Sequence, residues 1–162
     1  MATSEIHIPE SVRDEHRSIY AALVEATQAP GRIGAAATDL AEVLRAHFER
    51  EEQIALPPLG LLAPLTGGGV LPESVLSFAL AMTDSLRSEL PRMLDEHKKI
   101  RAAAENLRLA ARAAHATKYE ELAEQLASHA QMEEEVLYPA AILVGDVIRA
   151  RRQAKQGGIP VG

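Results

Sequence analysis

The stretch HFEREE at residues 47–52 decides the fold, and Pro57 follows it closely. A second stretch, HAQMEE at 129–134, repeats the pattern and has Pro139 in the corresponding place. In each copy a histidine and a glutamate stand four residues apart, so on an α-helix both side chains project from one face within reach of one ion. The pattern predicts two helices that each present a nitrogen and an oxygen ligand together.

A shorter motif precedes each copy. DEHR at 14–17 lies upstream of the first copy, and DEHK at 95–98 lies upstream of the second. His47 follows His16 by 31 residues, and His129 follows His97 by 32. The chain therefore consists of two related helix pairs.

The composition favours an all-α protein of one domain. The chain has 162 residues, of which 47% are hydrophobic and only 3% are aromatic. Alanine and leucine dominate and runs of β-branched residues are few, which favours helix over sheet. We expect a single domain over 1–162, with a core at about 9–152 and a flexible tail at 153–162.

Several classes of site and partner are excluded by composition. Cysteine is absent, which excludes disulfides, iron–sulfur clusters and thiolate zinc sites and leaves histidine and carboxylate as metal ligands. The net charge of −6 argues against a nucleic-acid partner. The longest apolar stretch, 54–65, is broken by prolines and a glycine and is too short to span a bilayer. Residues 1–10 lack the features of a signal peptide, so we expect a soluble cytoplasmic protein without a membrane partner.

Apolar periodicity predicts four principal helices in up-down order. The first begins near Pro9 or Ser11 and stops at Ala29-Pro30-Gly31, and the second covers about 35–55. Prolines and glycines predict a loop over 56–71. Residues 72–89 form an extra helix, or the start of the third helix over about 91–114, because Pro91 would break or kink a continuous one.

The fourth principal helix opens at Thr117, and Pro139 ends or bends it before a C-terminal helical extension. Ser11 with Asp14, and Thr117 with Glu120, have the sequence pattern of capping boxes. The predicted fold is therefore an up-down four-helix bundle with an extra helical segment before the third helix and a C-terminal helical extension.

Six residues that can bind metal fall on the inward faces of these helices. A lone histidine on an apolar face is usually a satisfied core residue, but here the pattern recurs at matched offsets on all four helices. Two buried glutamates also require compensation by ions or hydrogen bonds. His7 and His115 lie outside the helices, and we expect them at the surface. The predicted metal ligands are His16, His47, Glu51, His97, His129 and Glu133.

Together these motifs, with Glu96 before His97 and Tyr138 before Pro139, resemble the hemerythrin-like, or HHE cation-binding, family across about 9–152. The resemblance implies a hemerythrin-like four-helix bundle that holds a non-haem di-iron centre. It also implies that one iron is bound by His16 and His47 and the other by His97 and His129. Glu51 and Glu133 would bridge the two ions.

Ligand chemistry agrees with this expectation independently. Imidazole-rich sites with a few carboxylates suit iron, zinc or manganese better than calcium or magnesium. Two divalent ions bring four positive charges, and two glutamates cancel only half of them. We therefore expect an oxo or hydroxo bridge, or a bound anion.

The sequence departs from the oxygen-carrying hemerythrins at one position. Those proteins have a further histidine four residues after the third one, where this chain has Arg101, and the position four residues after His16 is Tyr20. Tyr20 either contacts a bound oxygen species or packs with its hydroxyl satisfied. Arg101 pairs with an anion or with a surface acid. Glu52 and Glu134 support the ligands or are spare ligands.

The extra open coordination positions favour redox chemistry, sensing or iron handling over oxygen transport. We expect a protein that binds O2, NO or peroxide at the centre, with possible peroxide-directed redox activity, and whether it is an enzyme stays open. One alternative is an iron store or an iron or oxygen sensor without turnover. Another is a helical interaction module with a vestigial metal site. The oligomeric state is not predicted.

Overall fold

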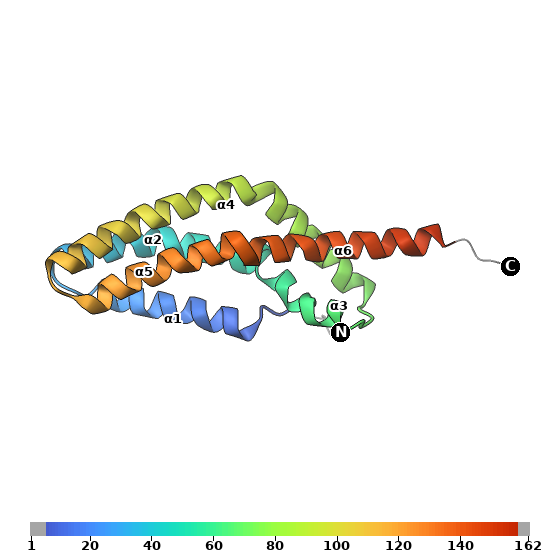
Figure 1. Cartoon of the computed structure of the whole chain (residues 1–162), viewed down its shortest axis with the longest axis horizontal. Helices are drawn as coiled ribbons and strands as arrows, with labels where there is room; N and C mark the ends of the chain where they lie inside the picture. The colour runs from blue at the N-terminus through green and yellow to red at the C-terminus, as the bar shows by residue number, and fades with distance from the viewer. Residues whose placement is uncertain (1–5, 159–162) are drawn as a thin grey trace.

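The computed structural model describes residues 6–158, and this part of the chain is mostly helical and contains no strand. Four long helices form the predicted up-down bundle (Figure 1). They are α1 (Glu10–Ala26), α2 (Gly31–Ile54), α4 (Glu73–Ala113) and α5 (Thr117–Met132). The 3₁₀-helix η1 (Pro57–Leu61) and the short α3 (Leu62–Thr66) connect the halves, and the π-helical η2 (Glu133–Leu137) joins α5 to α6 (Tyr138–Gly157).

The helix ends differ from the predicted capping boxes. Pro9 precedes α1 and Ala116 precedes α5, and neither helix start has a capping hydrogen bond from a side chain, so both capping boxes were wrong. Gly31, at φ 70°, opens α2 with a left-handed backbone conformation that glycine adopts without steric cost. α2 therefore begins four residues earlier than the periodicity indicated.

Pro91 does not break α4. The helix runs through this residue without interruption, so the expected extra segment and the third helix are one element. A proline inside a helix removes one backbone hydrogen bond and kinks the chain. Figure 1 shows α4 bent between its two arms. The arm that precedes Pro91 packs against α6 outside the bundle.

The predicted loop over 56–71 is largely helical as well. η1 and α3 occupy ten of these residues, and their apolar side chains Leu59, Leu61 and Leu65 are buried. Prolines suit the first turn of a helix, where the missing N–H has no partner to lose. Because its leucine side chains are buried, the segment covers one end of the bundle.

Both histidine–glutamate motifs end in a wide helical turn. The Leu56 N–H donates to the Glu51 carbonyl at 2.9 Å, and the Tyr138 N–H donates to the Glu133 carbonyl, five residues back in each case. Each proline follows directly, at 57 and 139, where it has no N–H to contribute. The wide turn makes room for Pro139, so the helix continues into α6.

α6 extends beyond the expected core. It continues to Gly157, so residues 153–157 of the predicted tail are helical, and residues 159–162 lie outside the described part. Among the described residues, no helix is both long enough and apolar enough to cross a membrane.

The core consists of apolar clusters on either side of a polar layer. One cluster fills the bundle between α1, α2, α4 and α5 and includes Ile19, Leu44, Ile100 and Leu126. A second cluster lies toward η1 and α6 and includes Leu56, Leu86, Met93 and Tyr138. On α1, α2 and α4 the predicted ligands stand between the parts that contribute to these two clusters. Along the α5 path, the first cluster takes its residues from α5 and the second from η2 and α6.

Candidate metal centre

All six predicted ligands lie in this polar layer, and none of their side chains is more than 4% exposed. α1 contributes His16, α2 contributes His47 and Glu51, and α4 contributes His97. His129 is in the last turn of α5, and Glu133 opens the π-helical turn. Helix periodicity alone puts each of them on the inward face, because the apolar residues around them recur at the same three- and four-residue spacing.

Their ligand atoms form two groups that could each hold a metal ion. His47, Glu51, His97 and Glu133 make the first group, and His16, His129 and Glu133 make the second, with the atoms of each group within 4.8 Å of one another. The structure therefore places His47 with His97 and His16 with His129. This differs from the pairing that the family resemblance implied. The His47 and His97 rings lie 4.6 Å apart between centroids, and the His16 and His129 rings lie 5.0 Å apart.

The two glutamates connect the groups. Glu133 Oε1 lies 2.6 Å from His129 Nε2 and 3.2 Å from His16 Nε2, and its Oε2 lies 3.0 Å from His97 Nε2. Glu51 Oε1 lies 3.1 Å from His47 Nε2, and its Oε2 lies 3.5 Å from His16 Nε2. Each carboxylate thus offers one oxygen to each histidine pair, as a bridging ligand must.

The imidazoles are oriented by acids on their outer side. Glu96 Oε2 lies 2.7 Å from His47 Nδ1, Glu134 Oε1 lies 2.8 Å from His97 Nδ1, and Glu15 Oε1 lies 3.2 Å from His129 Nδ1. Metal-binding histidines usually donate their second N–H to a carboxylate, which directs the free lone pair of the other nitrogen at the metal. The arrangement holds three of the four Nε2 atoms toward the centre.

Two of these acids are held in turn by arginines. Arg50 donates to Glu96, and Arg101 donates to Glu134 at 2.9 Å. Arg101 therefore pairs with an acid rather than with a bound anion. These contacts lower the pKa of Glu134: burial alone would raise it, but hydrogen bonds from Arg101 and His97 outweigh burial.

Tyr138 is a member of the site that the sequence argument did not single out. Its hydroxyl donates to Glu51, and the oxygen lies 3.1 Å from His97 Nε2 and 3.3 Å from His47 Nε2. Burial and the charges of Glu51 and Glu133 raise its pKa, so the hydroxyl keeps its proton. The available signal in the sequence was the place of Tyr138 directly before Pro139 in the motif that resembles the family.

Buried charge in the layer is balanced by protonation when metal is absent. Burial lowers the pKa of His47, but hydrogen bonding and charge from Glu51, with Glu96, raise it to about 9. Burial likewise opposes protonation of His129, and Glu133 raises its pKa to about 9. Burial and the charge of Glu133 raise the pKa of Glu51. Two carboxylates at this depth thus draw positive charge to the centre.

The donor set fits metal ions. Glu51 Oε2 is buried without a hydrogen-bond partner among the described residues. His47 Nε2 and His97 Nε2 lie 2.9 Å apart, although both rings have an acid at Nδ1. When both rings are neutral with their protons on Nδ1, the two Nε2 lone pairs face each other, and either a proton or a metal cation between them stabilises the contact. The cluster could hold two ions, with His47, His97, Glu51 and Glu133 on one side and His16, His129 and Glu133 on the other, where Glu51 Oε2 also lies 3.5 Å from His16 Nε2.

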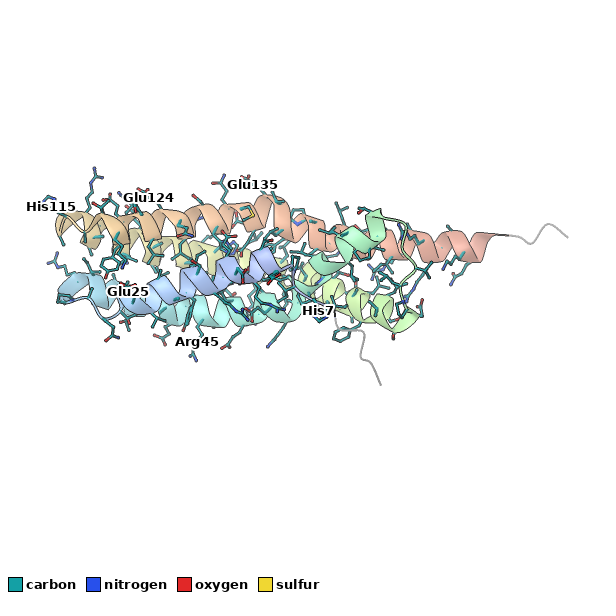
Figure 2. The ribbon with its side chains drawn as sticks, turned by 90° about the horizontal axis from the view of Figure 1, so that it is seen from below. His7, Glu25, Arg45, His115, Glu124 and Glu135 are labelled. Carbon is teal, nitrogen blue, oxygen red and sulfur yellow. The ribbon has the colours of Figure 1, made fainter. Side chains whose placement is uncertain are left out.

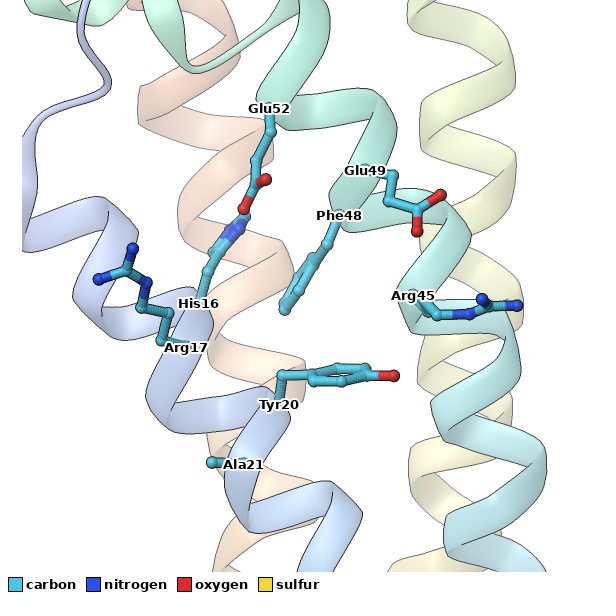
Figure 3. A pocket seen from close by; sticks show the side chains of 8 residues that line it. All are labelled: His16, Arg17, Tyr20, Ala21, Arg45, Phe48, Glu49 and Glu52. Carbon is cyan, nitrogen blue, oxygen red and sulfur yellow. The ribbon is translucent and has the colours of Figure 1, made fainter.

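The remaining candidates lie outside this cluster. Tyr20 is half-buried in a surface pocket beside His16, and its hydroxyl points across toward Arg45 of α2 rather than toward the ligands (Figure 3). Glu52 lines the same pocket. His115 lies in the turn between α4 and α5 at one end of the bundle, and His7 lies far from that end (Figure 2). Both of these histidines are exposed, as expected.

Comparison with protein families gives one match. Residues 78–156 match the model of the hemerythrin HHE cation binding domain. The matched span contains His97, His129, Glu133 and Tyr138, whereas His16, His47 and Glu51 reach the site through the fold. Comparisons with curated proteins and with solved structures gave no significant match.

Proposed function

This chain belongs to the hemerythrin-like (HHE cation-binding) family, and on that premise we propose that it holds two iron ions and binds O2, NO or peroxide at them. The metal-binding character follows from the family and from the buried histidine–glutamate cluster. The identity of the metal, the number of ions and the small ligand are the proposal.

The observation that carries the proposal is the position of Glu51 and Glu133 between the two histidine pairs. Each carboxylate presents separate oxygens to histidines of both groups. Such an arrangement supports two ions side by side rather than one. The mixed nitrogen and oxygen donors suit iron, zinc or manganese and disfavour calcium and magnesium.

Iron, when bound there, supplies open coordination positions and the electron-transfer chemistry that binding and reduction of oxygen species require. The chain's own contribution is to exclude water and to place one proton donor. Apolar residues such as Met93, Ile19 and Ile100 are buried above and below the layer. The Tyr138 hydroxyl donates to Glu51 when metal is absent, and it becomes the proton donor for a small bound ligand once Glu51 binds metal instead.

Metal analysis together with absorption spectroscopy tests this proposal. We expect two irons per chain after anaerobic loading with ferrous iron, and a near-ultraviolet absorption band that changes on exposure to air, NO or peroxide. His129→Ala should lose iron, whereas His115→Ala, which alters an exposed histidine in the α4–α5 turn, should retain it.

Other outcomes of this experiment would each favour a different function. Two irons with a spectrum that does not respond to any of the three ligands would replace ligand binding with iron storage. Spectroscopic change with peroxide and its consumption over many equivalents would establish turnover. Absence of iron after loading, with the helical fold intact, would overturn the proposal in favour of a vestigial site.

A further inference from the structure

The internal duplication of the site is incomplete at one histidine. The acid before His97, Glu96, serves His47, and the acid before His16, Glu15, serves His129. The acid after Glu133, Glu134, serves His97. By the same relation Glu52, which follows Glu51, should serve His16. His16 Nδ1 instead has neither a neighbouring acid nor a hydrogen-bond partner among the described residues. His129 Nδ1 also has no hydrogen bond there, but Glu15 Oε1 lies 3.2 Å from it.

A pocket opens to the surface at this histidine. Its volume is about 300 Å³, and it lies between α1 and α2 with His16, Phe48, Tyr20 and Glu52 among its lining residues. The Phe48 ring stacks on His16 at 3.8 Å between centroids, so the two rings form the inner wall. Figure 3 shows the Glu52 side chain reaching over the pocket toward the His16 ring, while Arg17 and Arg45 point away on either side.

The opposite face of the site is closed at the equivalent place. There Arg101 donates to Glu134 and holds it against His97. The residue that corresponds to Arg101 is Tyr20, which cannot form an ion pair with Glu52. Glu52 is accordingly exposed, whereas Glu134 is half-buried. Glu134 is thus held in place by Arg101, whereas the exposed Glu52 side chain is free to move.

We propose that the pocket between α1 and α2 is the port through which metal ions and small ligands reach the centre, and that Glu52 closes it by accepting the N–H of His16 Nδ1. The inference rests on the proposed function, because it requires a metal-binding centre. It assigns Glu52 two effects. In the closed position the carboxylate orients His16, and in the open position it exposes the inner wall of the pocket.

Filling the pocket tests the port. Ala21 lines it and is exposed, and the duplication pairs this residue with Ala102 on the face that Arg101 and Glu134 close. We expect Ala21→Trp to slow both ferrous iron uptake and its release to a chromogenic chelator, with the final iron content unchanged. Ala102→Trp should leave both rates at the wild-type values. Equal rates in the two variants would overturn the port.

Changing the acid tests the gate. Without Glu52 the imidazole loses its outer partner, so we expect Glu52→Ala to release iron about tenfold faster, in line with the loss of an outer-shell partner. Glu52→Gln keeps an oxygen acceptor and should restore slow release. Glu49→Ala, a second acid of the same pocket, should release iron at the wild-type rate. Unchanged release in Glu52→Ala would overturn the role of Glu52.

Failure of this inference is distinguishable from failure of the proposed function. If the wild-type chain takes up no ferrous iron, the proposed function fails before any rate is compared. If the wild-type chain loads iron and the Ala21 and Glu52 variants behave like their controls, only the port and its gate are refuted. Circular dichroism of each metal-free variant shows whether the bundle is intact.

Discussion

At the scale of single residues, Tyr138 differs from the six predicted ligands of the centre. The six predicted ligands belong to the duplicated motifs, whereas Tyr138 adds a hydroxyl group to the centre from outside them. It donates to Glu51 and lies near His47 and His97 without being part of the repeated motif. The corresponding residue in the first half is Leu56, so only one half of the site has a hydroxyl.

Tyr138→Phe should keep two irons but bind a small ligand more weakly. The ring still packs in the apolar cluster, and the variant removes one hydrogen bond to the ligand. A hydrogen bond to a neutral ligand contributes roughly 0.5–1.5 kcal/mol, so the Kd for NO should rise by about twofold to tenfold. Titration followed by absorption measures the effect. Tyr119→Phe, at the far end of α5, should bind NO normally, and equal Kd values in both variants would contradict the prediction.

The metal-free protein should lose stability as the pH rises. His47 and His129 have a pKa of about 9 in the folded chain against an ordinary value of 6.5. A raised pKa of a histidine stabilises the fold fully below pH 6.5, and this contribution disappears as the pH rises through 9. Urea unfolding of chelator-treated protein at pH 6, 7.5 and 9.5 measures the change. The double variant His47→Gln/His129→Gln should show a flatter dependence of stability on pH. A wild-type stability that stays constant or rises with pH would refute the prediction.

At the scale of elements, two helical paths continue at prolines that the sequence predicted would break or bend them. α4 passes through Pro91, and the α5 path continues past Pro139 by means of the π-helical turn. The path of α4 through Pro91 and the wide turn before Pro139 bring α6 alongside the arm of α4 that precedes Pro91. The two helices are in tight contact at Gly145, where an added Cβ atom would lie 2.3 Å from Thr83 Oγ1 and 2.9 Å from Thr83 Cβ.

Gly145→Ala should therefore destabilise the protein although alanine favours helix. The added methyl group has no space against Thr83, and forcing extra atoms into a packed contact costs about 1–3 kcal/mol. Thermal unfolding measures the loss. Gly157→Ala is the matched control in the same helix, because an added Cβ there meets nothing within 4 Å. A Gly145→Ala variant as stable as this control would show that α6 and α4 separate easily.

At the scale of the whole molecule, the centre lies where four helices meet. Two apolar clusters border it, and its charged groups are among the most buried in the described chain. Metal ions at this position would bind residues of α1, α2, α4, α5 and the π-helical turn at once. Binding energy at such a site is shared with folding, because the unfolded chain does not bring these residues together.

Iron loading should raise the melting temperature. Metal in excess of its dissociation constant by about a thousandfold stabilises the folded chain by about 4 kcal/mol. For a chain of this length, that gain corresponds to a rise of roughly 10 °C. Differential scanning calorimetry of loaded and chelated protein measures the shift. The rise should vanish in His129→Ala, and an equal rise in that variant would mean that iron binds elsewhere.

The sequence by itself determined the four helices and the inward-facing positions of the six predicted ligands. Both follow from local rules: apolar residues recur with the period of a helix, and the duplicated motifs place a histidine or glutamate at fixed steps within that period. The same motifs carry the resemblance to the HHE family, and the family match over residues 78–156 bears it out.

Only the tertiary structure decided how these residues combine. The pairing of His47 with His97, the partners Glu15, Glu96 and Glu134, and the arrival of Tyr138 all depend on contacts between helices distant in the chain. The continuity of α4 and α6 through their prolines likewise depends on packing and on one wide turn. Local periodicity states which face of a helix is buried, but the approach of helices in space determines what that face meets.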